Sequence, residues 1–393
     1  MKNNKVNFIY EIPTKIYFGC DNIKFLSDEL NKYGKKVLLV YGGGSIKKNG
    51  LYDEIINEIK SADIELFELS GIEPNPRHTS VNEGARICKE NNIDVVLAVG
   101  GGSVIDAAKF ISTGAFYEGD VWDIVTKKVN ITKALPIVDI LTILATGSEM
   151  DCSGVITNLD TKEKIGCKSS LLRPKVSFLD PSNTYSVSAY QTACGSADIL
   201  SHIIETYFSP TNGLYMLDKI MEGLMKTVIK YVPIAIKDPN NYEARANLMW
   251  ASSWAINDFI RYDKSHSWSC HAMEHQLSAF YDITHGLGLA ILTPRWMEYV
   301  LDDITVSKFY DFGVNVFSID CNLPKMEVAK KSIVEFKKFL YEDLGLTSNL
   351  LDLDINEEYF EEMASRICKN GNLPGFKSLN KEDIINIYKM CLK

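Results

Sequence analysis

Asp94-Val-Val-Leu-Ala-Val-Gly-Gly-Gly-Ser103 is typical of a buried strand that ends in a glycine turn and leads into a helix. The apolar run before the glycines fits a strand that is covered on both faces. A helical pattern near Val104–Ser112 follows, with Ser103 as its expected N-cap. The stretch therefore predicts a strand–turn–helix unit of a parallel sheet.

The same alternation continues in both directions along the N-terminal half. Strand-like and helix-like patterns follow one another, which predicts a parallel sheet with helices on both faces. The expected elements are strands at Lys36–Tyr41, Ile64–Phe67, Asp94–Val99 and Ile140–Leu144, helices at Leu51–Lys60, Ser80–Asn91 and Val104–Ser112, and a hairpin of Val155–Asn158 with Lys164–Lys168.

The pattern changes after Asp180-Pro181, where long segments of helical period replace the strands. The chain of 393 residues is therefore expected to form an α/β domain over 1–182 and an all-α domain over 183–393, with a ligand in a cleft between them. The expected helical segments are Ala197–Tyr207, Leu214–Tyr231, Ala244–Phe259, His271–Phe280 and Lys325–Leu344.

Charge and composition argue against several classes of partner. The net charge is −9 and the sequence has no basic block, so nucleic acid is not expected as a partner. No run approaches the ~20 apolar residues of a membrane span. The nine cysteines are scattered without C-x-x-C pairs, and the N-terminus lacks the apolar core of a signal peptide. A cytoplasmic protein with free thiols is expected.

Four of the six histidines fall into one group with a nearby aspartate. Asp198 and His202 are four residues apart, as are His271 and His275, and His285 precedes what is expected to be a glycine-containing turn. Residues four apart lie on one face of a helix. One carboxylate and three imidazoles suit Zn²⁺ or Fe²⁺ and leave a position for substrate. Either half alone also fits a surface pair or a capped core histidine.

Two glycine turns predict a nucleotide site. Gly100-Gly101-Gly102-Ser103 precedes a helix N-terminus, where unpaired N–H groups favour a pyrophosphate, although the run is not a G-x-G-x-x-G fingerprint. Gly42-Gly-Gly44-Ser45 is followed by Lys47 and Lys48 and has no acid, so it can accommodate NADP(H). A third turn, Ala145-Thr-Gly-Ser-Glu149, could hold phosphate or ribose. Tight or capped turns without a ligand stay open as alternatives.

In combination, these stretches resemble the iron-containing (group III) alcohol dehydrogenases, and within them the NADPH-dependent butanol dehydrogenase and aldehyde reductase branch. The resemblance spans most of the chain and implies a Rossmann-like N-terminal domain and a helical C-terminal domain, an architecture shared with dehydroquinate synthase. The matching stretches are Tyr41–Gly50, Gly71–Pro76, Leu97–Val104, Ala145–Glu149 and the histidine group.

The resemblance implies a role for individual residues. It implies hydride transfer between NADP(H) and primary alcohols or aldehydes such as butanol and butanal, with one Fe²⁺ or Zn²⁺, in a homodimer. His275 would lie beside the nicotinamide and substrate. The metal ligands would be Asp198, His202, His271 and His285, and the cofactor would contact Gly42, Gly43, Ser45, Gly101, Gly102, Ser103, Asp106, Thr142, Thr146 and Lys164.

One departure from the family and two rival functions stay open. Glu274 stands where the family usually has a small residue; it could raise the pKa of His275 or point into solvent. A lyase resembling dehydroquinate synthase would need several basic residues near the metal, and the sequence offers chiefly Arg261 and Lys264 there. A metal-binding protein without catalytic activity is the second rival. Apolar runs at Phe8–Tyr10 and Ile16–Phe18 are expected to be strand edges.

Overall fold

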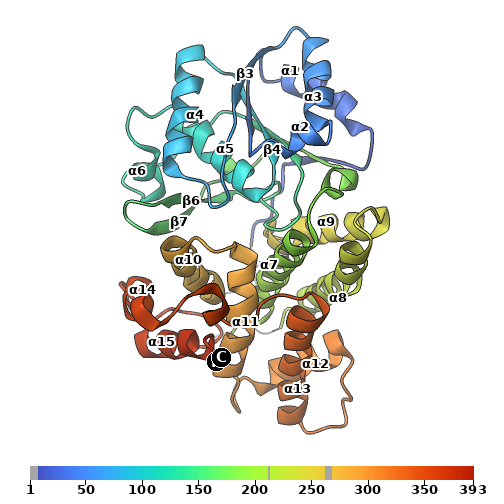
Figure 1. Ribbon diagram of the computed structural model, residues 1–393, viewed down its shortest axis with the longest axis vertical. Coiled ribbons are helices and arrows are strands. Elements are labelled where there is room, and N and C mark those ends of the chain that lie inside the picture. The colour runs from blue at the N-terminus through green and yellow to red at the C-terminus, as the bar shows by residue number, and fades with distance from the viewer. Residues whose placement is uncertain (1–7, 211–212, 262–267) are drawn as a thin grey trace. The chain divides into compact units, whose positions relative to one another are not determined.

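The computed structural model describes residues 8–210, 213–261 and 268–393. These residues form two compact units, one built on a parallel sheet and one made of helices (Figure 1). The sheet unit comprises Ile12–Ser188 and Asp238–Ser253. The helical unit comprises Ala189–Lys237 and Trp254–Lys393, with the described residues before Ile12. The division into domains 1–182 and 183–393 stays a prediction.

The sheet unit contains a six-stranded sheet in the order β1-β8-β5-β4-β2-β3. Every neighbouring pair is parallel, as the alternating pattern predicts. A separate antiparallel pair, β6 and β7, confirms the expected hairpin. The strands are β1 (Lys15–Phe18), β2 (Lys36–Tyr41), β3 (Glu65–Leu69), β4 (Val95–Gly100), β5 (Ile137–Leu141), β6 (Ser153–Asn158), β7 (Glu163–Lys168) and β8 (Val176–Leu179).

Two sequence-based strand assignments differ from the structure. The expected strand Ile140–Leu144 is shifted, because β5 already ends at Leu141. Beyond that point Ile143 lies against the second glycine turn, so the apolar run continues although the strand has ended. The run Phe8–Tyr10 forms no strand, whereas Ile16–Phe18 lies in β1 and pairs with β8.

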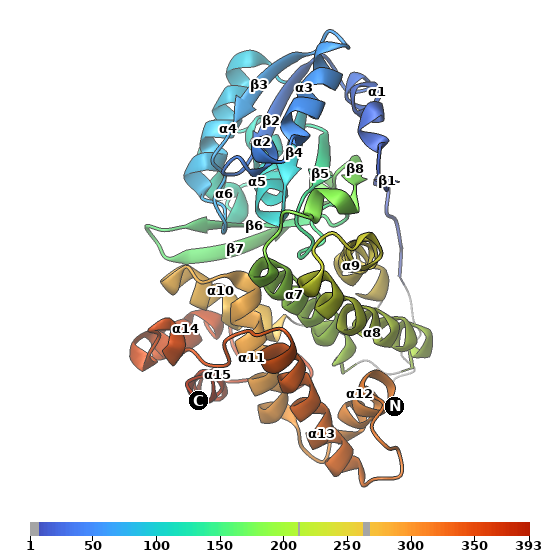
Figure 2. The same cartoon turned by 45° about the vertical axis from the view of Figure 1, so that its right-hand side comes forward.

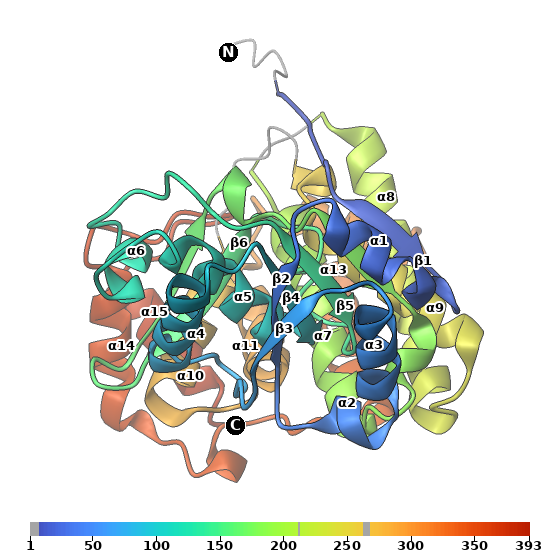
Figure 3. The same cartoon turned by 90° about the horizontal axis from the view of Figure 1, so that it is seen from above.

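Helices cover both faces of the sheet (Figure 3). Alternate residues of the central strands, such as Leu39 and Leu97, pack in one core with Leu30 of α1 and Ile55 of α3. The intervening residues are equally buried on the face that carries α4 and α5. The helices of this unit are α1 (Leu26–Asn31), α2 (Ser45–Lys48), α3 (Leu51–Lys60), α4 (His78–Asn91), α5 (Gly102–Gly114) and α6 (Val121–Val125).

The helical unit is organised around α7, which packs between α8 and α11 (Figure 2). The five helical segments expected after Asp180 are all found, with Lys325–Leu344 ending in a π-helical turn over Phe339–Asp343. Within the described residues, no helix is both long and apolar enough to cross a membrane. The larger helices after Ser188 are α7 (Ala189–Tyr207), α8 (Tyr215–Lys237), α9 (Tyr242–Ile256, whose first part lies in the sheet unit), α10 (Ser269–Tyr281), α11 (His285–Val300), α12 (Val306–Phe317), α13 (Lys325–Lys338), α14 (Phe360–Ile367) and α15 (Lys381–Met390).

Candidate metal centre and nucleotide-binding edge

Three helices of the helical unit bring the four predicted metal ligands together. Asp198 and His202 lie one turn apart on α7, His271 lies in the first turn of α10, and His285 is the first residue of α11. Asp198 Oδ1 is 3.5 Å from His202 Nε2, 3.5 Å from His271 Nε2 and 3.7 Å from His285 Nε2. Tetrahedral bonds of about 2.1 Å place neighbouring donors about 3.4 Å apart. Asp198, His202 and His271 place their donor atoms within 4.8 Å of one another, as ligands of a single ion would, and His285 Nε2 adjoins this trio through Asp198.

Two of the donor atoms have no hydrogen-bond partner in the described part of the chain. Asp198 Oδ1 and His271 Nε2 are buried there without a hydrogen bond, and a separation of 3.5 Å is too long for a good one. Unpaired buried polar atoms are costly unless something else satisfies them. One carboxylate oxygen and three imidazole nitrogens suit Fe²⁺ or Zn²⁺, so the residues fit the group that the sequence predicts.

The charges around these atoms also favour a cation. Burial would raise the pKa of Asp198, but the imidazoles, His202 first, lower it below its ordinary value. Burial lowers the pKa of His202 to about 3, so its ring is neutral, as a ligand must be. Burial would also lower the pKa of His271, yet Glu205 and Asp198 raise it to about 9. The carboxylates thus stabilise positive charge where a divalent ion would carry it.

Two further carboxylates contact the outer nitrogens of the histidines. Glu205 of α7 contacts His271 Nδ1, and Glu274 of α10 contacts His285 Nδ1. Both glutamates are almost completely buried. His202 differs: its Nδ1 has no hydrogen-bond partner among the described residues, and its ring stacks on His271 at 4.6 Å with Trp268 at its edge.

The position of Glu274 contradicts one of the two expectations about it, that it points into solvent, while an effect on the pKa of His275 stays a prediction. Its side chain is fully buried rather than solvated, and its carboxylate bonds to His285 and Ser278 Oγ. His275 itself is half-buried on α10, with its ring centre 5.7 Å from that of His285. It lies beside the four donors, where an imidazole can exchange a proton with solvent.

The glycines after His285 do not form the expected turn. Gly286 and Gly288 lie inside α11. A Cβ atom on Gly286 would be 1.9 Å from the carbonyl oxygen of Cys194 in α7, and one on Gly288 would be 2.8 Å from Glu274 Cγ. These glycines therefore permit close helix packing, which brings His285 to Asp198.

Most of the predicted nucleotide residues lie in the sheet unit near the carboxyl ends of β2, β4 and β5, whereas Lys164 lies on β7. Along the sheet, β2 leads to β3 in one direction and β4 leads to β5 in the other, so the order of strands reverses between β2 and β4. Open α/β sheets bind ligands at such a point, beyond the carboxyl ends of the strands. Both glycine turns begin there: Gly42–Gly44 follows β2 and Gly101–Gly102 follows β4.

The second glycine turn is joined to the loop after β5. A Cβ atom on Gly102 would be 2.1 Å from Thr146 Oγ1, and the backbone N–H of Thr142 donates to Gly100 O at 3.0 Å. The predicted N-cap, Ser103, is wrong by two residues: α5 begins at Gly102 with the extended Gly101 as its N-cap. The bare glycine backbone at this helix N-terminus is suited to an anion.

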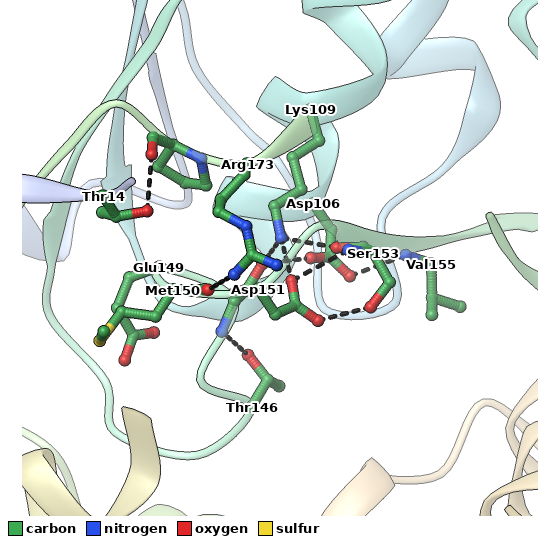
Figure 4. Close-up of polar contacts among 12 residues, drawn as sticks. Thr14, Asp106, Lys109, Thr146, Glu149, Met150, Asp151, Ser153, Val155 and Arg173 are labelled. Atoms are coloured by element: carbon green, nitrogen blue, oxygen red, sulfur yellow. Dashed lines mark hydrogen bonds and ion pairs between the residues drawn. The ribbon is translucent and has the colours of Figure 1, made fainter. Parts of the chain in front are cut away.

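A buried polar network fixes this loop against α5 (Figure 4). Asp106 accepts hydrogen bonds from Ser148 Oγ at 2.6 Å and from the backbone N–H of Val155 at 2.8 Å. Lys109, fully buried, donates to Ser148 Oγ at 2.8 Å and forms an ion pair with Asp151. Both Asp106 oxygens are thus engaged within the protein, and burial raises the pKa of this carboxyl to about 6. A cofactor contact of Asp106 stays a prediction.

The first glycine turn is open but has a charged cluster beside it. A Cβ atom on Gly43 would meet nothing within 4 Å. Next to this turn, Lys47 Nζ lies over the rings of Tyr41 and Tyr52, at 5.1 and 4.5 Å from their centres. Both tyrosine hydroxyls donate to Glu68, at 2.9 and 2.6 Å. Lys47 could be noticed in the sequence beside the glycine turn. Glu68 could not, because it comes from the next strand, β3.

Two other features complete this edge of the sheet unit. Lys164 is buried on β7 opposite Thr157 in the hairpin. A crevice of about 540 Å³, within the range of small-molecule sites, is lined by residues after β1 and β8 and by the segment around Asn49. This crevice could not be predicted from the sequence, because its lining comes from three separate connections and from Ile140 of β5. Lys264, considered for the lyase alternative, lies outside the described residues.

Comparisons with known proteins agree with this geometry. Residues 13–181 match the model of the iron-containing alcohol dehydrogenases, and residues 192–392 match the C-terminal model of the Fe-containing alcohol dehydrogenase family. The chain is 50% identical over 386 residues to NADH-dependent butanol dehydrogenase A of Clostridium acetobutylicum, covering 98% of this chain and 99% of that protein. It is 32% identical to the NADPH-dependent aldehyde reductase YqhD of Escherichia coli, covering 93% and 94%.

Solved structures give the same result. The crystal structure of NADH-dependent butanol dehydrogenase A from Thermotoga maritima superposes with a TM-score of 0.94 at 41% identity, covering 99% of each chain. The predicted family and the predicted fold class are both confirmed. This chain is a member of the iron-containing alcohol dehydrogenase family, and thus a metal-dependent oxidoreductase.

Proposed function

We propose that this protein interconverts short-chain aldehydes and primary alcohols, such as butanal and butanol, with a nicotinamide dinucleotide and one Fe²⁺ or Zn²⁺. The observation that carries the proposal is the convergence of His202, His271 and His285 on Asp198, whose Oδ1 lies 3.5 to 3.7 Å from their Nε2 atoms. The butanol dehydrogenases and the aldehyde reductase among the relatives support this substrate class.

The chain's own residues divide the work of this reaction. When bound, the metal supplies a Lewis acid for the substrate oxygen, and the nicotinamide supplies or accepts hydride. Asp198, His202, His271 and His285 would hold the metal. The backbone at Gly101 and Gly102 would bind the pyrophosphate, with Thr146 fixing that turn. His275, half-buried beside His285, would pass a proton between substrate and solvent.

We also propose that NADP(H) is the preferred nucleotide. Gly43 and Ser45 leave room for a 2′-phosphate, and Lys47 supplies positive charge. Two features support NADH instead: the acid Glu68 beside Lys47, and relatives whose names specify NADH. A homodimer and a cytoplasmic location, in keeping with the nine free cysteines, are also proposed.

The proposal is tested with the purified protein stripped of metal and reloaded separately with zinc and with iron. Short and medium aldehydes are assayed with NADPH and NADH, following the absorbance of the reduced nucleotide. We expect turnover in at least one metal form and its loss in H271A, because that variant removes a donor from the centre of the site. Turnover that survives both metal removal and H271A would overturn the proposal, as would no oxidation of either nucleotide with any aldehyde.

A further inference from the structure

Glu205 lies where two helices of the candidate metal centre meet. It is on α7, three residues after His202, and is 2% exposed. Its carboxylate accepts the backbone N–H of Cys270 at 2.7 Å and the backbone N–H of His271 at 3.2 Å, and it contacts His271 Nδ1. One side chain thus holds both the backbone and the imidazole of a predicted ligand that is 66 residues away.

The two backbone contacts perform the function of a helix cap. The first turn of an α-helix has N–H groups without intrahelical acceptors. In α10 the N-cap residue Trp268 forms no side-chain capping bond, and Cys270 and His271 are the second and third residues of the helix. Glu205 satisfies these N–H groups from another helix, and its negative charge also suits the positive end of the α10 dipole.

The imidazole contact fixes which nitrogen of His271 can bind a metal. The Glu205 carboxylate accepts a hydrogen bond from Nδ1–H, which leaves Nε2, 3.5 Å from Asp198 Oδ1, as the nitrogen that can bind a metal. We propose that Glu205 is a positioning residue that couples the docking of α10 on α7 to metal retention. This inference rests on the proposed metal-dependent function.

Glu274 provides a matched comparison, because its bonds differ in kind. It contacts His285 Nδ1 with one oxygen and accepts from Ser278 Oγ with the other. A glutamine there can accept from His285 and donate to Ser278 Oγ, whose proton can turn to Ile283 O at 3.4 Å. A glutamine at 205 cannot do this, because backbone and ring N–H groups approach both oxygens and its NH₂ would face one of these donors.

The test measures metal affinity in wild type, E205Q and E274Q, by competition of a chelator for Zn²⁺ and for Co²⁺. We expect E205Q to lose about 10–100-fold in affinity, as is typical when a partner of a ligand histidine is removed. The loss in E274Q is expected to be smaller. The visible absorption of bound Co²⁺ should change in E205Q, and hydrogen exchange at the amides of Cys270 and His271 should accelerate.

The outcomes separate this inference from the function on which it rests. If wild type retains neither ion, the proposed function fails. If wild type binds tightly and E205Q binds equally well, or if E274Q loses as much as E205Q, the positioning role of Glu205 is overturned. Should E205Q not fold, E205D keeps the charge but not the reach. It is then expected to bind Zn²⁺ more weakly than wild type, and an equal affinity would overturn the inference.

Discussion

Glu68 accepts hydrogen bonds from Tyr41 and Tyr52 and lies beside Lys47 at the first glycine turn. A fixed carboxylate there repels a 2′-phosphate and holds Lys47 by its charge. We predict that E68Q lowers the KM for NADPH relative to that for NADH by up to about fivefold, since exposed charges contribute about 1 kcal/mol or less.

The salt dependence and a control on the same strand make this prediction specific. The change in the KM ratio should shrink as salt is added. E65Q provides the control, because Glu65 lies at the amino end of β3 beside Lys36, 3.7 Å away. An equal change of the KM ratio in E65Q, or no change in E68Q, would contradict the assignment.

Asp139 is a second residue with a testable consequence. It is fully buried on β5, accepts from Ser177 Oγ at 2.7 Å, and its Oδ1 has no partner among the described residues. Burial, and then the charge of Glu149, raise its pKa well above the ordinary value. The folded state therefore holds a proton that the unfolded state releases, so this residue's contribution to stability falls as pH rises above the unfolded pKa.

Replacing this carboxyl by an amide removes that dependence. We expect D139N to melt higher than wild type near about pH 8 and close to wild type near about pH 4. Each 1 kcal/mol gained in the free energy of unfolding raises the melting temperature by roughly 2–4 °C. Thermal unfolding followed by circular dichroism across this range checks the prediction. A lower melting temperature for D139N at the alkaline end would show that Asp139 is ionised and stabilising.

At the scale of single residues, spacing in the sequence explains part of the site. Asp198 and His202 share a face because helical geometry is local, and the strand pattern placed the glycine turns correctly. Glu205 could be noticed three residues after His202, yet its role depends on a contact with α10 far along the chain. The burial of Glu274 likewise depends on the gap that Gly288 leaves.

At the scale of elements, the approach of α11 to α7 depends on Gly286. A methyl group there would lie 1.9 Å from Cys194 O, and backbone on both sides cannot yield easily. We expect G286A to destabilise the protein by about 1–3 kcal/mol, as overpacking usually does. It should also lower Zn²⁺ affinity, because His285 would move away from Asp198. Chemical denaturation and chelator competition measure the two effects.

Gly223 offers the matched control for that variant. It is exposed on α8, and a Cβ atom there would meet nothing within 4 Å. G223A is therefore expected to gain up to about 1 kcal/mol, because alanine is the better helix former. If G286A were as stable as wild type while G223A behaved as expected, the inference that α11 packs closely on α7 at Gly286 would be wrong.

The elements themselves were predictable where the pattern was regular. The bounds of β2 and α3 match the sequence prediction, because β2 is a continuous apolar run that ends before Gly42 and α3 is a regular helical pattern that starts after Gly50. The glycines of α11 were mistaken for a turn because glycine serves both turns and close helix contacts. The limits of β5 depended on Ile143, which packs on a turn rather than in the sheet.

At the scale of the whole molecule, the predicted binding sites for the metal and for the nucleotide lie in different units. All four metal donors lie in the helical unit, and both glycine turns lie in the sheet unit. A ligand stabilises the region that binds it. We expect Zn²⁺ to slow hydrogen exchange in α7, α10 and the start of α11, and NADPH or NADH alone to slow it around 42–45 and 100–106. Protection by the metal that is confined to the sheet unit would contradict the site assignment.

The unanchored ring of His202 has a consequence for kinetics rather than affinity. Glu205 and Glu274 tether the outer nitrogens of two imidazoles, whereas His202 Nδ1 has no hydrogen-bond partner among the described residues and its ring contacts His271 and Trp268. If His202 holds an ion, we expect its bond to open first when the ion departs, because its ring lacks a carboxylate partner at Nδ1 among the described residues. The residence time of the bound ion, measured by stopped-flow exchange, should shorten in W268A. The shortening should exceed that in variants of Glu205 or Glu274 with the same equilibrium affinity for the ion.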